Sequence, residues 1–190
     1  MKRLNLGCGR NPMAGWINLD SMPLPGIDVT ADLERCADTP LPFENDSIDE
    51  FLLSHVIEHI RAPLPLMQEL WRIAKPGARL TIRTPYGHSD DAWTDPTHVR
   101  PYFIHSFGFF SQPLYWKADY GYRGDWKTNR IVLFVDPSER SLKPEQILSK
   151  VNSLRNVVKE MVAELTAVKP IRAADLSLQD PINIEIAFMG

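Results

Sequence analysis

Cysteine is scarce in this chain, which has only Cys8 and Cys36 among its 190 residues. Two cysteines fall far short of the framework that stabilises small secreted domains, so disulfides are not expected to hold the fold. Long hydrophobic runs are missing too. No stretch approaches the roughly 20 apolar residues that span a bilayer, and the N-terminus lacks the apolar region of a secretory signal. These absences favour a reduced, cytoplasmic setting without a membrane span.

An excess of positive charge is also absent. The formal net charge is −3 at pH 7, and lysine and arginine form no dense run, so nonspecific binding to nucleic acid is not expected. The remaining composition, 44% hydrophobic and 24% charged, is ordinary for a globular protein. The length predicts a single domain over residues 1–190 with room for a sizeable core.

A short strand followed by a glycine turn opens the chain. The apolar segment Arg3–Leu6 runs into Gly7-Cys8-Gly9, and a second strand candidate, residues 16–19, leads into Asp20. Glycine lets the backbone approach a ligand without a Cβ in the way. A carboxylate at the tip of the next strand accepts hydrogen bonds from ribose hydroxyls in dinucleotide folds. The pattern therefore predicts a nucleoside-binding site.

Five segments in order carry a resemblance to a known family. They are Leu4 to Gly9 (LNLGCG), Asp32-Leu33, Leu41-Pro42-Phe43 with Ser47-Ile48-Asp49, Phe51 to Ile60 (FLLSHVIEHI), and Leu70 to Pro85 (LWRIAKPGARLTIRTP). Together they resemble the class I S-adenosylmethionine-dependent methyltransferases of the type 11 group, over roughly residues 1–110. The resemblance implies S-adenosyl-L-methionine as cofactor.

The chain departs from that family directly after the glycine turn. The usual motif continues to a third glycine and a full helix, whereas residues 10–15 (RNPMAG) leave no room for a helix of ordinary length. We therefore expect a shortened first helix. Position 12 is proline, where the G-x-G-x-x-G pattern of a nicotinamide-dependent oxidoreductase needs glycine, so that alternative is disfavoured.

Alternating strand and helix patterns predict an α/β fold with a doubly wound, mostly parallel, Rossmann-like sheet. A helix is expected over 64–74, ended by the Pro76-Gly77 turn. By the resemblance, residues 182–188 would form an antiparallel last strand. The strand candidates are 3–6, 16–19, 50–54, 78–84, 130–135 and 182–188.

Residues 141–168 are expected to form one long helix inserted before the last strand. Apolar residues recur there at alternating steps of four and three, which is the spacing of a coiled-coil stripe: Ile147, Val151, Leu154, Val158, Met161 and Leu165. Such a helix would either cover its own domain or pair with a second copy in a homodimer.

The cofactor-binding residues follow from the motifs. Gly7 and Gly9 are expected to face the methionine part, with Cys8 packed between them as a small residue. Asp20 is expected at the ribose. The resemblance places Asp32 and Leu33 at the adenine, although Asp32 also suits an ordinary helix N-cap. Ser54 and His55 lie where a strand ends, which is where ligands bind in open α/β sheets.

The polar segment from Trp93 to Phe103 (WTDPTHVRPYF) follows the fifth strand candidate and should overhang the reacting methyl group. His98 is a candidate base for an acceptor hydroxyl or amine, with Asp95 orienting it. Arg100 is a candidate for holding an anionic acceptor group. All three could instead only tie down the loop.

The segment His55-Val56-Ile57-Glu58-His59 fits the H-x-x-E-H pattern of inverted zinc peptidases. Such a peptidase needs this pattern inside a long helix. Here an apolar strand leads straight into it, and Pro63 follows four residues after His59. We therefore expect Glu58 and His59 to shape the pocket or cap a short helix, and we predict no metal site.

The preferred function is methyl transfer to a small-molecule or glycan-type acceptor. The Asn/Asp-Pro-Pro-Tyr/Phe sequence of many nucleic-acid amino methyltransferases is absent, and Ser54-His55 stands at that place. A noncatalytic S-adenosylmethionine-binding module remains the main alternative.

Overall fold

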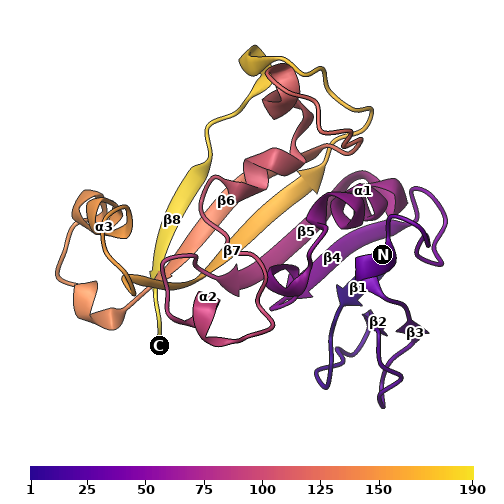
Figure 1. Ribbon diagram of the computed structural model, residues 1–190, viewed down its shortest axis with the longest axis horizontal. Coiled ribbons are helices and arrows are strands. Elements are labelled where there is room, and N and C mark those ends of the chain that lie inside the picture. Colours follow the sequence, from indigo (N-terminus) through magenta and orange to yellow (C-terminus); the bar gives the residue numbers. More distant parts are fainter.

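The computed structural model describes residues 1–190 and contains one eight-stranded sheet with the strand order β3-β2-β1-β4-β5-β7-β6-β8 (Figure 1). The α/β fold with a mostly parallel sheet is confirmed. The strands are β1 (Arg3–Leu6), β2 (Ile17–Asp20), β3 (Val29–Thr30), β4 (Ile48–Ser54), β5 (Ala74–Pro85), β6 (Trp126–Val135), β7 (Val158–Ala167) and β8 (Asn183–Phe188).

One face of the sheet packs into the core because alternate residues of each strand point to the same side. On β4 these are Phe51 and Leu53, both without exposed surface, and Phe51 meets the ring of Trp126 edge-on at 5.8 Å. Strands β2, β1, β4 and β5 run parallel. Their carboxyl ends therefore lie along one edge of the sheet.

Helix α1 (Pro63–Ile73) covers this core face, which confirms the helix expected over 64–74. Proline suits its first turn because the missing N–H has no intrahelical partner there. Its buried stripe includes Leu66, Leu70 and Ile73, and Trp126 Nε1 donates a hydrogen bond of 2.9 Å to the Met67 carbonyl. The other α-helices are short: α2 (Asp91–Thr94) and α3 (Pro144–Val151).

No helix connects β1 to β2, so the expected shortening of the first helix is confirmed in its extreme form. A hydrogen-bonded loop takes its place. Asn18 Oδ1 accepts from the Met13 amide at 2.8 Å and from Asn5 Nδ2 at 3.1 Å. These amide side chains are buried and supply the partners that a helix backbone would otherwise provide.

The long helix expected over 141–168 is wrong. Only α3 is helical there, a turn follows at residues 152–157, and β7 occupies Val158–Ala167. β7 lies in the middle of the sheet, antiparallel to both β5 and β6 (Figure 1). Its buried residues alternate as Met161, Ala163 and Leu165, which is the period of a strand.

The direction expected for the last strand is also wrong. β8 pairs parallel with β6 at the edge of the sheet, and the antiparallel position belongs to β7. Because β7 is antiparallel to both β5 and β6, β6 runs in the same direction as β5. β8 is parallel to β6, so β8 also runs in the direction of β4 and β5.

The opposite face of the sheet carries charged pairs. Arg130 on β6 reaches Glu164 on β7 at 2.5 Å and Glu185 on β8 at 3.0 Å. Arg83 on β5 pairs with Glu160 on β7. These side chains are partly exposed, so this face meets solvent with its charges matched. None of the helices has the length and hydrophobicity needed to cross a membrane.

Candidate active site

A cavity of about 240 Å³ lies where the parallel strands end, and we call it the strand-end cavity. It brings together four elements of the first sixty residues: the turn after β1, the tip of β2, the segment before β4 and the exit of β4. Its lining consists of Gly7, Asp20, Ser21, Ala31, Asp32, Leu33, Glu34, His55, Val56, His59 and Ile60. The lining thus includes five of the eight expected cofactor residues.

The glycine turn needs its two glycines for different reasons. Both adopt left-handed backbone conformations, with φ of +61° at Gly7 and +54° at Gly9. A Cβ at Gly7 would meet Val56 Cγ2 at 2.7 Å, so the turn packs directly on the exit of β4. A Cβ at Gly9 would meet nothing within 4 Å, which leaves that backbone open to a ligand. Cys8 is buried between them and does not line the cavity.

Asp20 is held by the turn that it faces. Its Oδ2 accepts from the Gly9 amide at 2.8 Å, and its Oδ1 accepts from the Met22 amide at 3.0 Å. A carboxylate has about four lone-pair sites, so both oxygens keep capacity for ribose hydroxyls. The carboxylate is therefore positioned before any ligand arrives.

Asp32 caps a short helix and also lines the cavity. Its Oδ1 caps the short 3₁₀ helix Leu33–Arg35 by accepting from the Glu34 amide at 3.0 Å. It also lines the strand-end cavity next to the buried Leu33. Capping fixes the backbone that presents both residues to a ligand.

His55 projects from the end of β4 with a left-handed φ of +55°. Its Nε2 lies 2.9 Å from Glu160 Oε1, and its Nδ1 lies 3.4 Å from Glu58 Oε1. Glu58 and, more weakly, Glu160 raise the pKa of His55 above its ordinary value, while partial burial opposes the rise. Ser54 is exposed and does not line the cavity.

The three expected catalytic residues do not form one cluster: His98 and Asp95 lie near each other, whereas Arg100 lines a different cavity. His98 Nε2 lies 3.9 Å from Asp95 Oδ2, too far for the hydrogen bond that would orient a base. Asp95 Oδ1 instead accepts from the Thr97 hydroxyl and amide. Arg100 lines a second cavity of about 620 Å³.

The second cavity, which we call the aromatic cavity, lies between the start of α1 and the segment 100–120. Apart from Arg61 and Arg100, its walls are mainly prolines and aromatic rings, including Phe103, Phe109, Phe110, Tyr115 and Tyr120. It adjoins the strand-end cavity along the chain, since Arg61 follows Ile60. No local sequence pattern groups these rings, because their positions depend on the path of the loop after β5.

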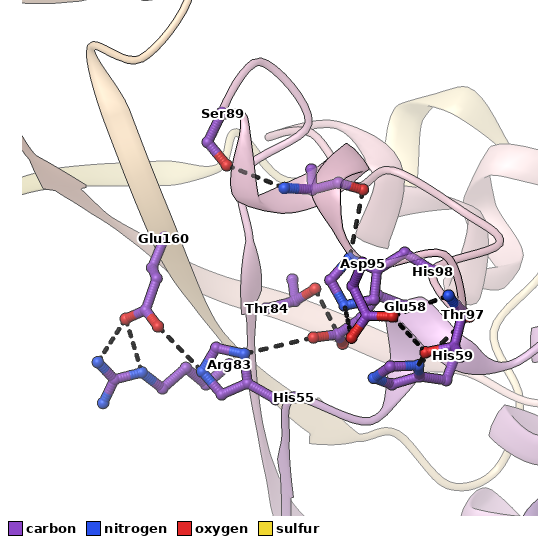
Figure 2. A network of polar contacts seen from close by, with 11 residues as sticks. His55, Glu58, His59, Arg83, Thr84, Ser89, Asp95, Thr97, His98 and Glu160 are labelled. Atoms are coloured by element: carbon purple, nitrogen blue, oxygen red, sulfur yellow. Dashed lines mark hydrogen bonds and ion pairs between the residues drawn. The ribbon is translucent and has the colours of Figure 1, made fainter.

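Glu58 and His59 reach further into the site than expected. They lie in the 3₁₀ turn Ile57–His59, and the rings of His59 and His98 meet edge-on with centroids 4.7 Å apart (Figure 2). A single 3₁₀ turn is not the long helix of a zinc peptidase, so that reading of H-x-x-E-H fails. The H-x-x-E-H pattern marks Glu58 and His59 in the sequence. His98, which packs against His59, is 39 residues further along the chain, so no local pattern connects it with them.

The strand-end cavity fits the cofactor that the motifs imply. Gly9 leaves open space above the turn, Asp20 presents a fixed carboxylate, and Asp32 and Leu33 form one wall. Such a set suits a nucleoside with a charged amino-acid tail.

A family model described as "Methyltransferase domain" matches residues 4–82. No curated protein sequence matches the chain.

Solved structures share the fold. An S-adenosylmethionine-dependent methyltransferase from Archaeoglobus fulgidus is 18% identical with a TM-score of 0.59, over 87% of this chain and 86% of that one. One from Thermotoga maritima is 15% identical with a TM-score of 0.54, over 88% and 82%. A chain from the complex between the Haloferax volcanii Trm112 methyltransferase activator and a methyltransferase is 13% identical with a TM-score of 0.55, over 90% of this chain and 83% of that one. The strand-end cavity lies within the segment that matches the methyltransferase family model, and the solved structures that share the fold include S-adenosylmethionine-dependent methyltransferases.

Proposed function

We propose that this methyltransferase acts on a small-molecule or glycan-type acceptor that enters through the aromatic cavity. The observation that carries the proposal is the presence of two unlike cavities whose linings meet at consecutive residues, Ile60 and Arg61. One presents a glycine turn and Asp20, and the other presents aromatic rings together with Arg61 and Arg100. Aromatic walls suit a planar or sugar ring, and a guanidinium suits an anionic substituent.

In this proposal the residues of the strand-end cavity hold the cofactor. Gly7 and Gly9 face the methionine part, Asp20 accepts from the ribose hydroxyls, and Asp32 and Leu33 contact the adenine. S-adenosylmethionine, when bound, supplies an electrophilic methyl group. Ser54, Cys8 and His55 support the backbone around the amino-acid tail.

The protein's own contribution is placement and exclusion of water, because methyl displacement needs an aligned acceptor more than a strong catalyst. Arg100 orients the acceptor through its anionic group. His98 keeps its Nε2 lone pair for an acceptor proton, with Asp95 close enough to stabilise the imidazolium that results.

Calorimetric titration tests the cofactor site. The protein is expected to bind S-adenosylmethionine or its demethylated product but not NAD. Asp20→Ala should weaken the binding free energy of the cofactor by about 1.5–3 kcal/mol, which is the contribution of a hydrogen bond to a charged group. This corresponds to a roughly ten- to hundredfold loss of affinity. Asp38→Ala, an exposed aspartate outside both cavities, is the matched control. An unchanged dissociation constant in folded Asp20→Ala would remove Asp20 from the site.

Turnover separates the enzyme from a noncatalytic module. Incubation with panels of phenols, amines and sugars should yield demethylated cofactor for at least one class. Arg100→Ala should raise KM for an anionic acceptor without changing cofactor affinity. Binding of the cofactor with no product from any panel would favour the module.

A further inference from the structure

Three potential metal ligands converge beside the strand-end cavity. One ligand atom from each of Glu58, His59 and His98 lies within 4.8 Å of the other two. Glu58 and His59 come from the turn after β4, and His98 comes from the loop after α2 (Figure 2). The fold therefore brings together two imidazoles and one carboxylate from segments distant in sequence.

Glu58 is the least ordinary member of this cluster. Its side chain is only 3% exposed. Its Oε2 accepts from the Thr84 hydroxyl at 3.1 Å, whereas its Oε1 has no hydrogen-bond partner. Oε1 also lies 3.4 Å from His55 Nδ1, which gives an ion pair when that imidazole is protonated but no hydrogen bond. A buried carboxylate oxygen without a partner is costly, so the cluster is incomplete as it stands.

Both imidazoles are held in the tautomer that a metal requires. His98 Nδ1 lies 3.3 Å from the Ala92 carbonyl, and His59 Nδ1 lies 3.3 Å from the Thr97 carbonyl. A carbonyl only accepts, so each Nδ1 carries the proton and each Nε2 keeps its lone pair. Metal-bound histidines characteristically donate their other N–H to a carbonyl or carboxylate in this way.

The loop behind His59 adds a further layer of support. Thr97 Oγ1 lies 3.0 Å from His59 Nδ1 and itself donates to Asp95 Oδ1 at 2.6 Å. The chain Asp95–Thr97–His59 fixes the orientation of the ring. It also gives Asp95 a role that does not depend on contact with His98.

We propose that Glu58, His59 and His98 bind a divalent transition-metal ion of the Zn²⁺ type. Two imidazoles and a carboxylate are the ligand set of catalytic zinc sites, which leave a further coordination position open. Mg²⁺ and Ca²⁺ prefer oxygen ligands and are disfavoured here. Donors around a tetrahedral Zn²⁺ lie about 3.4 Å apart, so the side chains need to close by at most about 1.4 Å.

The position of the ion has one consequence for the reaction. His59 lines the strand-end cavity, so an ion held by the three side chains would lie beside this cavity and would supply Lewis-acid polarisation of an acceptor oxygen. This consequence rests on the proposed function, whereas metal binding itself does not. It would also replace a direct base role for His98 by a ligand role.

The test is metal binding by the full chain after removal of bound metal with a chelator. Zn²⁺ is titrated against a chromophoric competitor, with Mg²⁺ in parallel, and Co²⁺ serves as a spectroscopic probe. We expect one Zn²⁺ per chain, no competition by Mg²⁺, and visible Co²⁺ absorption of a low-coordinate site. Zn²⁺ should also raise the Tm, since a ligand that binds only the folded state stabilises it.

Variants decide whether the named residues form the site. His59→Ala and His98→Ala should each weaken Zn²⁺ by more than the roughly 10- to 100-fold that loss of an outer-shell partner costs. Glu58→Gln keeps the volume of the buried side chain and should do the same. His105→Ala is the matched control, because His105 is exposed and lies outside the cluster.

The outcomes are distinct from those of the cofactor titration. Zn²⁺ affinity that is equal in His59→Ala, His98→Ala and His105→Ala would overturn the proposal, as would absence of Zn²⁺ binding to the folded parent. If cofactor binding failed while the two histidine variants lost Zn²⁺, only the proposed function would fall.

Discussion

At the scale of single residues, burial and neighbouring charge decide what a side chain can do. Cys36 is half-buried near the carboxylates of Glu69 and Asp32. Burial, followed by these two carboxylates, raises its pKa to about 12. Cys8 is buried in the glycine turn, and burial raises its pKa too, with the nearby Asp20 adding to the effect. Thiolate, the reactive form, is therefore suppressed at both positions.

We expect both thiols of the native protein to react slowly with a chromogenic disulfide reagent at pH 8. At a pKa of about 12, roughly one thiol in ten thousand is ionised at that pH. Unfolding in guanidinium should release two reactive thiols, which provides the control. Rapid modification of the folded protein at pH 8 would contradict the burial assigned to Cys36.

At the scale of elements, a strand and a helix compete for the same residues in 141–168. The apolar stripe that predicted a long helix includes Val158, Met161 and Leu165, and all three are buried in β7 instead. Positions 161 and 165 are four apart, which satisfies a period of two as well as a helical step. The turn at 152–157 breaks the pattern, and Asn156 there adopts a φ of +62°.

Two aspartate substitutions distinguish the strand from the helix. Leu154 is 50% exposed in the turn, so Leu154→Asp should change stability by no more than about 0.5 kcal/mol. Ala163 has no exposed surface in central β7, so Ala163→Asp should cost more than about 4 kcal/mol by burying an unpaired charge.

Chemical denaturation measures both free energies of unfolding. A long helix would reverse the order, because Leu154 belongs to the predicted apolar stripe and Ala163 does not. Equally large decreases in the free energy of unfolding of both variants would contradict the turn at 152–157.

At the scale of the whole molecule, stability is distributed unevenly. β7 pairs along its length with β5 and β6, so the centre of the sheet is held from both sides. β3, by contrast, is a two-residue strand at one edge. The residues proposed to bind the cofactor lie on this thinner side, where loops without a helix follow β1 and β2. The side of the sheet that contains β1, β2 and β3 is therefore expected to have the lowest local stability.

Amide hydrogen exchange should show this gradient. We expect the slowest exchange in β4, β5 and β7 and fast exchange in residues 7–34 outside β2 and β3. Addition of S-adenosylmethionine should slow exchange in 7–34 most, because the ligand stabilises the loops that line its cavity. Mass spectrometry of peptic fragments measures it, and β8 serves as the internal reference. Protection gained at β8 but not at 7–34 would place the ligand elsewhere.

Much of the first half of the chain was predictable from its sequence. The strand–glycine–strand–aspartate pattern predicted that Gly7, Gly9 and Asp20 lie together, because all three follow or end adjacent parallel strands. In the structure Gly7 and Asp20 line one cavity, and the Gly9 amide donates to Asp20 Oδ2. The same holds for α1, whose apolar stripe and flanking proline are local signals. The absence of a first helix followed from loop length alone.

The tertiary structure decided what local signals left ambiguous. Residues 158–167 form a strand because β5 and β6 leave a gap whose two edges satisfy the backbone of β7, and no local pattern records that gap. Glu58, His59 and His98 likewise meet only because the loop after α2 returns to the exit of β4. Propensity and spacing act within a few residues along the chain. Strand pairing and ligand convergence depend on the partners that folding brings together.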